Sequence, residues 1–186
     1  MKKIGYQGIE GSNNEKAAKK FLKNISSDVE LCPLVSSKNV VNALRNSEID
    51  LGVMAIRNNI GGIVNETNEA LDSDIVLLEE IDVQIHHCLF FKSQNIDVKD
   101  IKYVASHEQA LLQTKNSLSK IFNNVELVKV ANMAVGAKQL FNGELSDKYA
   151  VVCTKIAGYD NNLFLYKENI EDRESITTFG LFSKRK

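Results

Sequence analysis

Short apolar runs alternate with amphipathic helical patterns along almost the whole chain, and this alternation constrains the fold more than any other feature. KKIGY, IDLGVMAI, IKYVAS and YAVVCT are typical of buried strands, whereas SKNVVNALRNSE and HEQALLQTKNSLSKIF are typical of helices. Strands that alternate with helices of this length predict an α/β fold. The sole proline, Pro33 in VELCPLV, predicts a strand at the edge of a sheet or the end of a strand.

The alternation divides into two halves. The run DIVLLEEIDVQIHHCLFFK reads as one long strand, or as two with a bend, and carries the chain from the first half into the second. The last strand patterns, LFLYKENI and TTFGLFSK, bring the chain back to the first half. We therefore expect two lobes, one formed by residues 1–75 and 168–186 and the other by residues 76–167. A cleft between two such lobes is a natural site for a small molecule.

Composition narrows the class of protein. The 186 residues carry a net charge of -1, from 23 basic and 24 acidic side chains, so no charge excess points to nucleic acid or to an anionic membrane. No window approaches the length of a membrane span, and MKKIGYQG lacks the apolar core of a signal peptide. Cys32, Cys88 and Cys153 are scattered, which favours reduced thiols. We expect a cytoplasmic protein.

Two glycine-containing loops are candidate ligand sites. In GIEGSNNE, Ser12 and Glu15 have capping-box spacing, and the start of the helix is either an anion-binding site or a plain helix cap. RNNIGGIVNE follows a strand and precedes a helix, which is where α/β sheets bind ligands. There Asn58 and Asn59 can hydrogen-bond a polar ligand and Arg57 can pair with a carboxylate. The alternative is that this loop contains asparagine and glycine only because both residues favour the backbone conformations of turns.

The histidines and two threonines near the end of the chain are further candidates. His86, His87 and His107 do not form a cluster with the ligand number or spacing of a zinc site, so we expect no metal. Thr177 and Thr178, in ESITTFGLF, precede an apolar run. Periodicity alone favours an ordinary last strand there.

Taken together, these stretches resemble the prephenate dehydratase family. GYQGIEGSNNEKAA is similar to the family's opening AYLGPEGTFSEQAA, MAIRNNIGGIVNET to VPIENSIEGSVNET, and VASHEQAL to VYSHPQAL. IHHCLF matches a His-Cys-Leu strand, and NIEDRESITTF matches the region that ends in the family's Thr-Arg-Phe. The resemblance covers about residues 4–182, and its five segments stand in the family's order.

The resemblance implies a two-lobed fold like that of the type II periplasmic binding proteins, with the substrate in the inter-lobe cleft. It implies a carbon–oxygen lyase that converts prephenate to phenylpyruvate, with loss of carbon dioxide and water, in phenylalanine biosynthesis. Aromatisation supplies much of the driving force, so we expect no cofactor. We also expect a homodimer or larger assembly, with no chorismate mutase segment before this region and no phenylalanine-binding regulatory domain after it.

The matching positions imply a site. Thr177 falls on the family's catalytic threonine, the proton donor to the departing hydroxyl. The resemblance and the loop chemistry together give the expected substrate-binding residues, which are Ser12, Arg57, Asn58, Asn59, Ser106, His107, Gln109, Thr178 and Phe179.

Several positions depart from the family pattern. The family arginine is Thr178 here, and Arg57-Asn58-Asn59 replaces Glu-Asn-Ser. The next family glutamate is Gly61, and the proline of the histidine run is Glu108. We hypothesise that Arg57 replaces the lost arginine from the opposite side of the cleft. These departures leave two alternatives open: a decarboxylase that does not aromatise prephenate, and an inactive protein that binds a small carboxylate.

Overall fold

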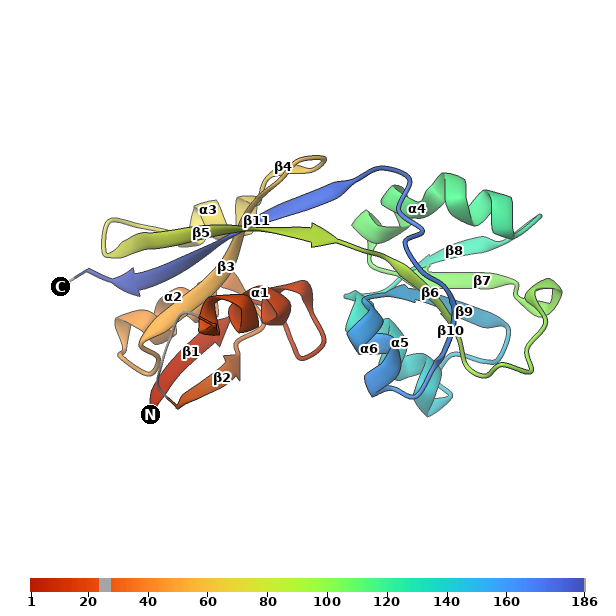
Figure 1. Ribbon diagram of the computed structural model, residues 1–186, viewed down its shortest axis with the longest axis horizontal. Helices are drawn as coiled ribbons and strands as arrows, with labels where there is room; N and C mark the ends of the chain where they lie inside the picture. The colour runs from red at the N-terminus through yellow and green to blue at the C-terminus, as the bar shows by residue number, and fades with distance from the viewer. Residues whose placement is uncertain (24–27, 186) are drawn as a thin grey trace. The chain divides into compact units, whose positions relative to one another are not determined.

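The computed structural model describes residues 1–23 and 28–185, and the chain divides into two compact units (Figure 1). Unit 1 comprises Met1–Ile85 and Ser175–Lys186, and unit 2 comprises His86–Glu174. Both boundaries lie further along the chain than the expected 75/76 and 167/168. The reason is that β5 (Ile75–Ile85) pairs along its length with β11 (Ser175–Lys184) in the sheet of unit 1.

The sheet of unit 1 is mixed. Its strand order is β2-β1-β3-β11-β5, and β4 pairs with β3 at the side. β1 runs parallel to β2 and β3, whereas β11 runs antiparallel to β3 and β5. β2 lies at an edge and ends at Pro33, as the proline predicted. The remaining strands are β1 (Lys2–Tyr6), β2 (Val29–Pro33), β3 (Leu51–Asn58) and β4 (Gly62–Ile63).

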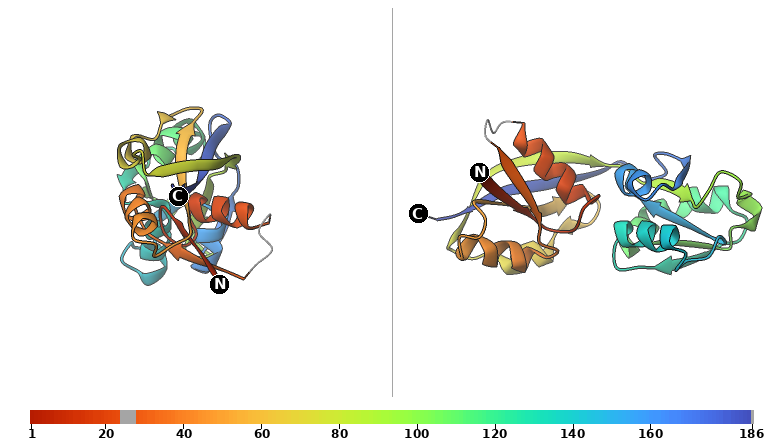
Figure 2. Two further views of the ribbon diagram at one scale, coloured as in Figure 1. Left: turned by 90° about the vertical axis from the view of Figure 1, so that its left-hand side faces the viewer. Right: turned by 90° about the horizontal axis from the view of Figure 1, so that it is seen from below.

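Helices cover both faces of this sheet, and Figure 2 shows α1 and α2 on different sides of it. The adjacent residues Val53 and Met54 of β3 point to opposite faces and belong to different core clusters. α1 packs on the Val53 face, and α2 packs on the Met54 face. Burial on both faces explains why the strands read as continuous apolar runs. The helices are α1 (Asn13–Leu22), α2 (Ser37–Arg45) and α3 (Asn65–Ala70).

Unit 2 has a second mixed sheet, with strand order β10-β6-β9-β7-β8. Leu89 and Phe91 of β6 pack with α4 on one face, and Cys88 and Phe90 pack with α5 and α6 on the other. The elements are β6 (Cys88–Phe91), η1 (Val98–Asp100), β7 (Tyr103–Ser106), α4 (Glu108–Ile121), β8 (Glu126–Lys129), α5 (Met133–Asn142), β9 (Tyr149–Cys153), α6 (Lys155–Asp160) and β10 (Phe164–Lys167).

The long apolar run that joins the two halves is two strands, β5 and β6, with His86 and His87 outside both. Within residues 1–23 and 28–185, no helix is long and apolar enough to cross a membrane.

Candidate active site

The end of β3 and the start of β11 meet at one edge of the unit 1 sheet. Thr177 is the cross-strand partner of Asn58, and Thr178 is the partner of Arg57. β3 runs parallel to β1, so this edge is also the carboxyl end of β1, where α1 begins. Carboxyl ends of parallel strands and the starts of the following helices form ligand sites in α/β sheets. The pairing therefore brings the predicted catalytic threonine to the edge where a ligand site is expected.

Asn58 is held in one orientation by the loop that follows it. Its Oδ1 accepts hydrogen bonds from the backbone N–H groups of Ile60 and Gly61, both at 2.9 Å. Backbone N–H groups can only donate, so this atom must be the amide oxygen. The amide nitrogen of Asn58 consequently faces β11.

That nitrogen contacts the hydroxyl of Thr177. Asn58 Nδ2 lies 2.9 Å from Thr177 Oγ1, and also 3.1 Å from Ser175 Oγ and 3.2 Å from the carbonyl of Ile176. An amide nitrogen is a donor, so Thr177 Oγ1 accepts this hydrogen bond. A hydroxyl that accepts through its oxygen keeps its own proton to donate elsewhere. The geometry thus suits Thr177 to donate a proton or hydrogen bond to a ligand.

Asn59 joins the same two strands through the backbone. Its N–H donates to the carbonyl of Ile176 at 3.0 Å, and its Oδ1 accepts from the N–H of Ile176 at 2.7 Å. This residue, predicted to bind substrate, therefore also fixes the position of the residue that precedes Thr177.

Thr178 and Arg57 lie on the other face of the sheet. Successive side chains of a strand point to opposite faces, so the partners Thr178 and Arg57 point away from the face that carries Thr177. The Thr178 hydroxyl donates to Asp82 at 2.6 Å. Arg57 forms a forked pair with Glu80, with N···O distances of 2.8 and 3.3 Å. Arg57 therefore shares a face with Thr178, the position of the family arginine, and not with Thr177; that Arg57 replaces this arginine stays a hypothesis.

Ser12 caps α1, as its spacing to Glu15 predicted. Its Oγ accepts from the N–H of Glu15 at 3.3 Å, and the Glu15 carboxylate accepts from the N–H of Gly11 at 2.8 Å. The turn before it is tight: a Cβ on Gly8, which has φ of 99°, would lie 3.1 Å from Ser12 Oγ. The cap therefore holds the loop close to the start of α1.

A polar network behind this edge was not predicted from the sequence. Glu66 accepts from Gln7 Nε2 at 2.9 Å and from the N–H of Ser37, in the first turn of α2, at 2.8 Å. The buried hydroxyls of Ser37 and Thr67 lie 2.9 Å apart. Gln7 Oε1 in turn accepts from the N–H of Ala55 on β3 at 3.2 Å. The motif VNET was the sequence signal that could have predicted this network. Its Glu66 and Thr67 join α3 to the start of α2 and to Gln7, which follows β1.

The remaining predicted residues have different surroundings. Phe179 is 1% exposed and belongs to the core cluster under α1. In unit 2, Ser106 is fully buried and donates to the carbonyl of Val152 at 2.6 Å. Neither side chain is open to a ligand. His107 and Gln109 are exposed at the start of α4, where the His107 ring accepts from the N–H of Gln109 at 3.3 Å.

Glu108, which stands where the family has proline, forms an ion pair with Lys129. That hydrogen bond is the main reason why the pKa of Glu108 lies below its usual range. The carboxylate therefore carries a negative charge beside His107.

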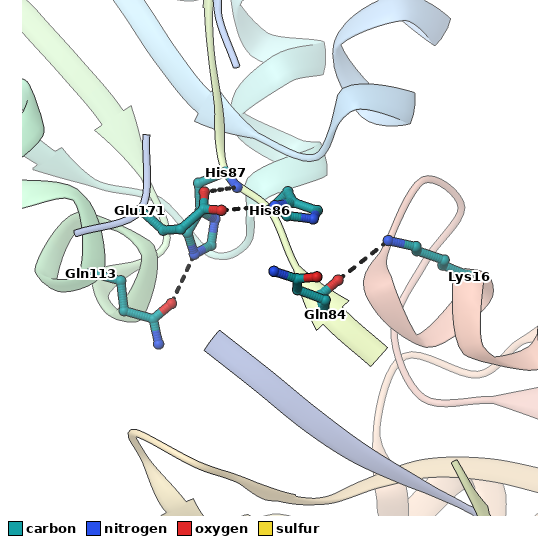
Figure 3. A network of polar contacts seen from close by, with 6 residues as sticks. All are labelled: Lys16, Gln84, His86, His87, Gln113 and Glu171. Atoms are coloured by element: carbon teal, nitrogen blue, oxygen red, sulfur yellow. Dashed lines mark hydrogen bonds and ion pairs between the residues drawn. The ribbon is translucent and has the colours of Figure 1, made fainter. Parts of the chain in front are cut away.

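Two further histidines belong to a network in unit 2 (Figure 3). Glu171 contacts His86 Nδ1 at 2.7 Å and accepts from the N–H of His87 at 3.0 Å. His87 Nε2 lies 2.8 Å from Gln113 Oε1, so it donates to that oxygen. Burial lowers the pKa of His87, which keeps the ring neutral near pH 7. Within residues 1–23 and 28–185, no group of three or more His, Cys, Asp or Glu is placed to hold a metal.

The sequence of this chain matches the family model described as Prephenate dehydratase over residues 4–186. The chain belongs to the prephenate dehydratase family. Prephenate dehydratase of Methanocaldococcus jannaschii is 33% identical over 187 residues, which cover 99% of this chain and 65% of that protein. Arogenate dehydratase/prephenate dehydratase 2 of Arabidopsis thaliana, a chloroplastic protein, is 27% identical over 183 residues, which cover 98% of this chain and 46% of that protein. The chain thus spans from about half to about two thirds of these family members.

Solved structures agree with the fold expected of the family. Prephenate dehydratase of Arthrobacter aurescens, solved in complex with L-Phe, superposes with a TM-score of 0.85 at 22% identity, covering 99% of this chain and 61% of that chain. A periplasmic substrate-binding protein of an ABC transporter from Coxiella burnetii gives a TM-score of 0.57 at 13% identity, covering 99% and 84%. The predicted fold class, a two-unit α/β prephenate dehydratase fold resembling periplasmic binding proteins, is confirmed.

Proposed function

We propose that this chain is a prephenate dehydratase that converts prephenate to phenylpyruvate, carbon dioxide and water. Membership of the family supports this activity. The observation that carries the proposal is the hydrogen bond from Asn58 Nδ2 to Thr177 Oγ1, at 2.9 Å. It leaves the hydroxyl proton of Thr177 free to be directed at a departing hydroxyl.

The proposed chemistry needs one proton donor and no redox change. The ring carboxylate of prephenate leaves as carbon dioxide, and the electrons of the broken bond move into the ring and expel the ring hydroxyl. A proton from Thr177 converts that leaving group to water, and solvent then returns a proton to Thr177. The ring becomes aromatic, which makes the step strongly favourable. The role of Asn58 is to hold the donor and to leave its proton unengaged.

The substrate also has a carboxylate that the product keeps, and this group needs donors. The Ser12 hydroxyl at the start of α1 is one proposed contact, because helix starts favour anions. His107 and Gln109, exposed at the start of α4, remain predicted contacts in unit 2. We leave Ser106 and Phe179 out of the proposed contacts because both are buried and engaged.

The test is turnover by wild-type protein and two Thr177 variants. Purified protein is incubated with prephenate, and in parallel with arogenate, the substrate named for the plant relative. Phenylpyruvate is followed by its absorbance and carbon dioxide is measured separately. We expect phenylpyruvate and carbon dioxide in equal amounts from prephenate. Thr177→Ala should lower kcat by about 100-fold or more, the size of a lost proton donor, and Thr177→Ser should retain part of it.

Each alternative gives a different result. Carbon dioxide with a non-aromatic product would identify a decarboxylase in place of a dehydratase. No product from either acid, together with a rise in melting temperature when prephenate is added, would identify a protein that only binds small carboxylates. Wild-type turnover that persists in Thr177→Ala would refute the role of Thr177.

A further inference from the structure

The structure brings together two positions at which this chain departs from the family pattern. In the segment similar to AYLGPEGTFSEQAA, Gln7 stands where the pattern has leucine. In the segment similar to VPIENSIEGSVNET, Ala55 stands where the pattern has proline. The two residues are 48 positions apart in the sequence, yet Gln7 Oε1 accepts a hydrogen bond from the N–H of Ala55 at 3.2 Å. The two departures therefore meet in a single contact.

This contact solves a problem that the loss of proline creates. Proline has no backbone N–H, whereas Ala55 has one that must be paired. Val53, two residues earlier on β3, is the partner of Tyr6, the last residue of β1, so the N–H of Ala55 points beyond the end of β1. Ala55 is only 9% exposed, and an N–H buried there without an acceptor would be costly. Leucine at position 7 would offer no acceptor, but glutamine does.

Glu66 fixes the orientation of the Gln7 amide. Gln7 Nε2 donates to the Glu66 carboxylate at 2.9 Å, and Oε1 accepts from a backbone N–H, which can only donate. Both ends of the amide are thus engaged, and the side chain is 8% exposed. The acceptor for Ala55 is therefore held in place and not merely nearby.

We infer that Gln7 and Ala55 together replace the leucine and proline of the family pattern, and that Gln7 positions Asn58 for its hydrogen bond to Thr177. Proline restricts a strand by fixing its own φ, and the Gln7 hydrogen bond restricts β3 at the same residue by fixing the direction of the N–H. Asn58 follows three residues later on this strand. The positioning role rests on the proposed function, since it concerns the proton donor of that reaction.

The experiment restores the family residues one at a time and together. The variants are Gln7→Leu, Ala55→Pro and the double variant Gln7→Leu/Ala55→Pro. Thr67→Val is the matched control, because it removes a buried hydroxyl contact with Ser37 from the same polar network and leaves the hydrogen bond between Gln7 and Ala55 intact.

Unfolding in urea tests whether the two departures form one exchange. Gln7→Leu leaves the N–H of Ala55 without an acceptor and should raise the equilibrium constant for unfolding by about 5- to 150-fold. Ala55→Pro leaves Gln7 Oε1 without its donor and should also raise this constant. The double variant has neither unpaired group, so its effect should be at least about fivefold smaller than the product of the single effects. Independent effects would overturn the exchange.

Amide hydrogen exchange gives a second measurement, which decides the matter if Ala55→Pro does not fold. In Gln7→Leu the N–H of Ala55 should exchange at least about fivefold faster than in wild type, because its hydrogen bond is lost. An unchanged exchange rate would overturn the inference.

Turnover tests the positioning role. Gln7→Leu should lower kcat for prephenate by about 10-fold or more and change KM less, because a displaced Asn58 affects the proton donor and not the binding of substrate. The double variant should recover kcat to within about threefold of wild type. Thr67→Val should destabilise the protein and keep wild-type kcat. A double variant as slow as Gln7→Leu, or an equal fall in kcat in Thr67→Val, would overturn the positioning role.

The inference and the proposed function fail in different ways. Wild-type protein that turns over prephenate, together with an unchanged kcat in Gln7→Leu, removes the positioning role and keeps the function. Wild-type protein that turns over neither prephenate nor arogenate refutes the function. The exchange between positions 7 and 55 is then decided by unfolding alone: coupled effects support it, and independent effects overturn it.

Discussion

Replacing Asn58 by aspartate is the most selective perturbation of the proposed proton donor. The two side chains have nearly the same shape, and an oxygen remains to accept from the N–H groups of Ile60 and Gly61. What changes is the group that faces Thr177, which becomes a charged acceptor in place of a donor. The Thr177 hydroxyl should then turn and donate to this carboxylate.

The expected loss of activity follows from that reversal. Before Thr177 can donate to substrate, it must break a hydrogen bond to a charged group, which is worth about 1.5–3 kcal/mol. That free energy adds to the activation barrier and corresponds to a fall in kcat of roughly 10- to 150-fold. The carbonyl of Ile176 loses a donor, but it still accepts from the N–H of Asn59.

The assay measures kcat and KM for prephenate in Asn58→Asp and in a control, Asn39→Asp. Asn39 also donates through its amide to a backbone carbonyl in unit 1, but it lies in the first turn of α2 and has no contact with Thr177. The control should retain wild-type kcat. Asn58→Asp with undiminished kcat, in protein that melts at the wild-type temperature, would refute the argument that Asn58 keeps the Thr177 proton available.

Three further predictions concern stability. Glu66→Ala leaves the two donors described above unpaired and should lower the free energy of unfolding in urea by about 1–3 kcal/mol, whereas Glu69→Ala on the same helix should change it little. Burial lowers the pKa of His87, so the unfolded state binds more protons near pH 6, and the free energy of unfolding should fall as the pH drops from 7.5 to 5.5. His87→Gln should show a smaller fall over this range. An equal fall in the variant would contradict the assignment of this pH dependence to His87. Gly158→Ala places a methyl group 2.2 Å from the ring of a fully buried phenylalanine and should destabilise by about 1–3 kcal/mol, while Gly61→Ala, whose Cβ meets nothing closer than 3.8 Å, should be nearly neutral.

Local patterns in the sequence predicted the parts of the structure that neighbouring residues decide. The α/β class, the edge position of Pro33 and the capping of α1 by Ser12 are confirmed. The family was identified from five short segments and is confirmed over residues 4–186. These features follow from side-chain periodicity and short-range hydrogen bonding, which a sequence displays directly.

The site depended on contacts between residues far apart in the chain. Asn58 and Thr177 are separated by 119 positions, and only the pairing of β3 with β11 brings them to 2.9 Å. The same register places Thr178 and Arg57 opposite each other on the other face of the sheet from Thr177, which the motifs alone did not show. The structure also shows that Lys16 Nζ donates to the carbonyl of Gln84, although these residues are 68 positions apart in the sequence.

The sequence by itself determined the elements, the fold class and the family of this protein. Only the tertiary structure decided which polar groups share a face with Thr177. The physical reason is that a sequence shows the alternation of apolar and polar residues along each strand, but does not show which strands lie next to each other in the sheet. Which strands pair, and in which register, depends on the burial of both sheet faces and on backbone hydrogen bonds between distant segments.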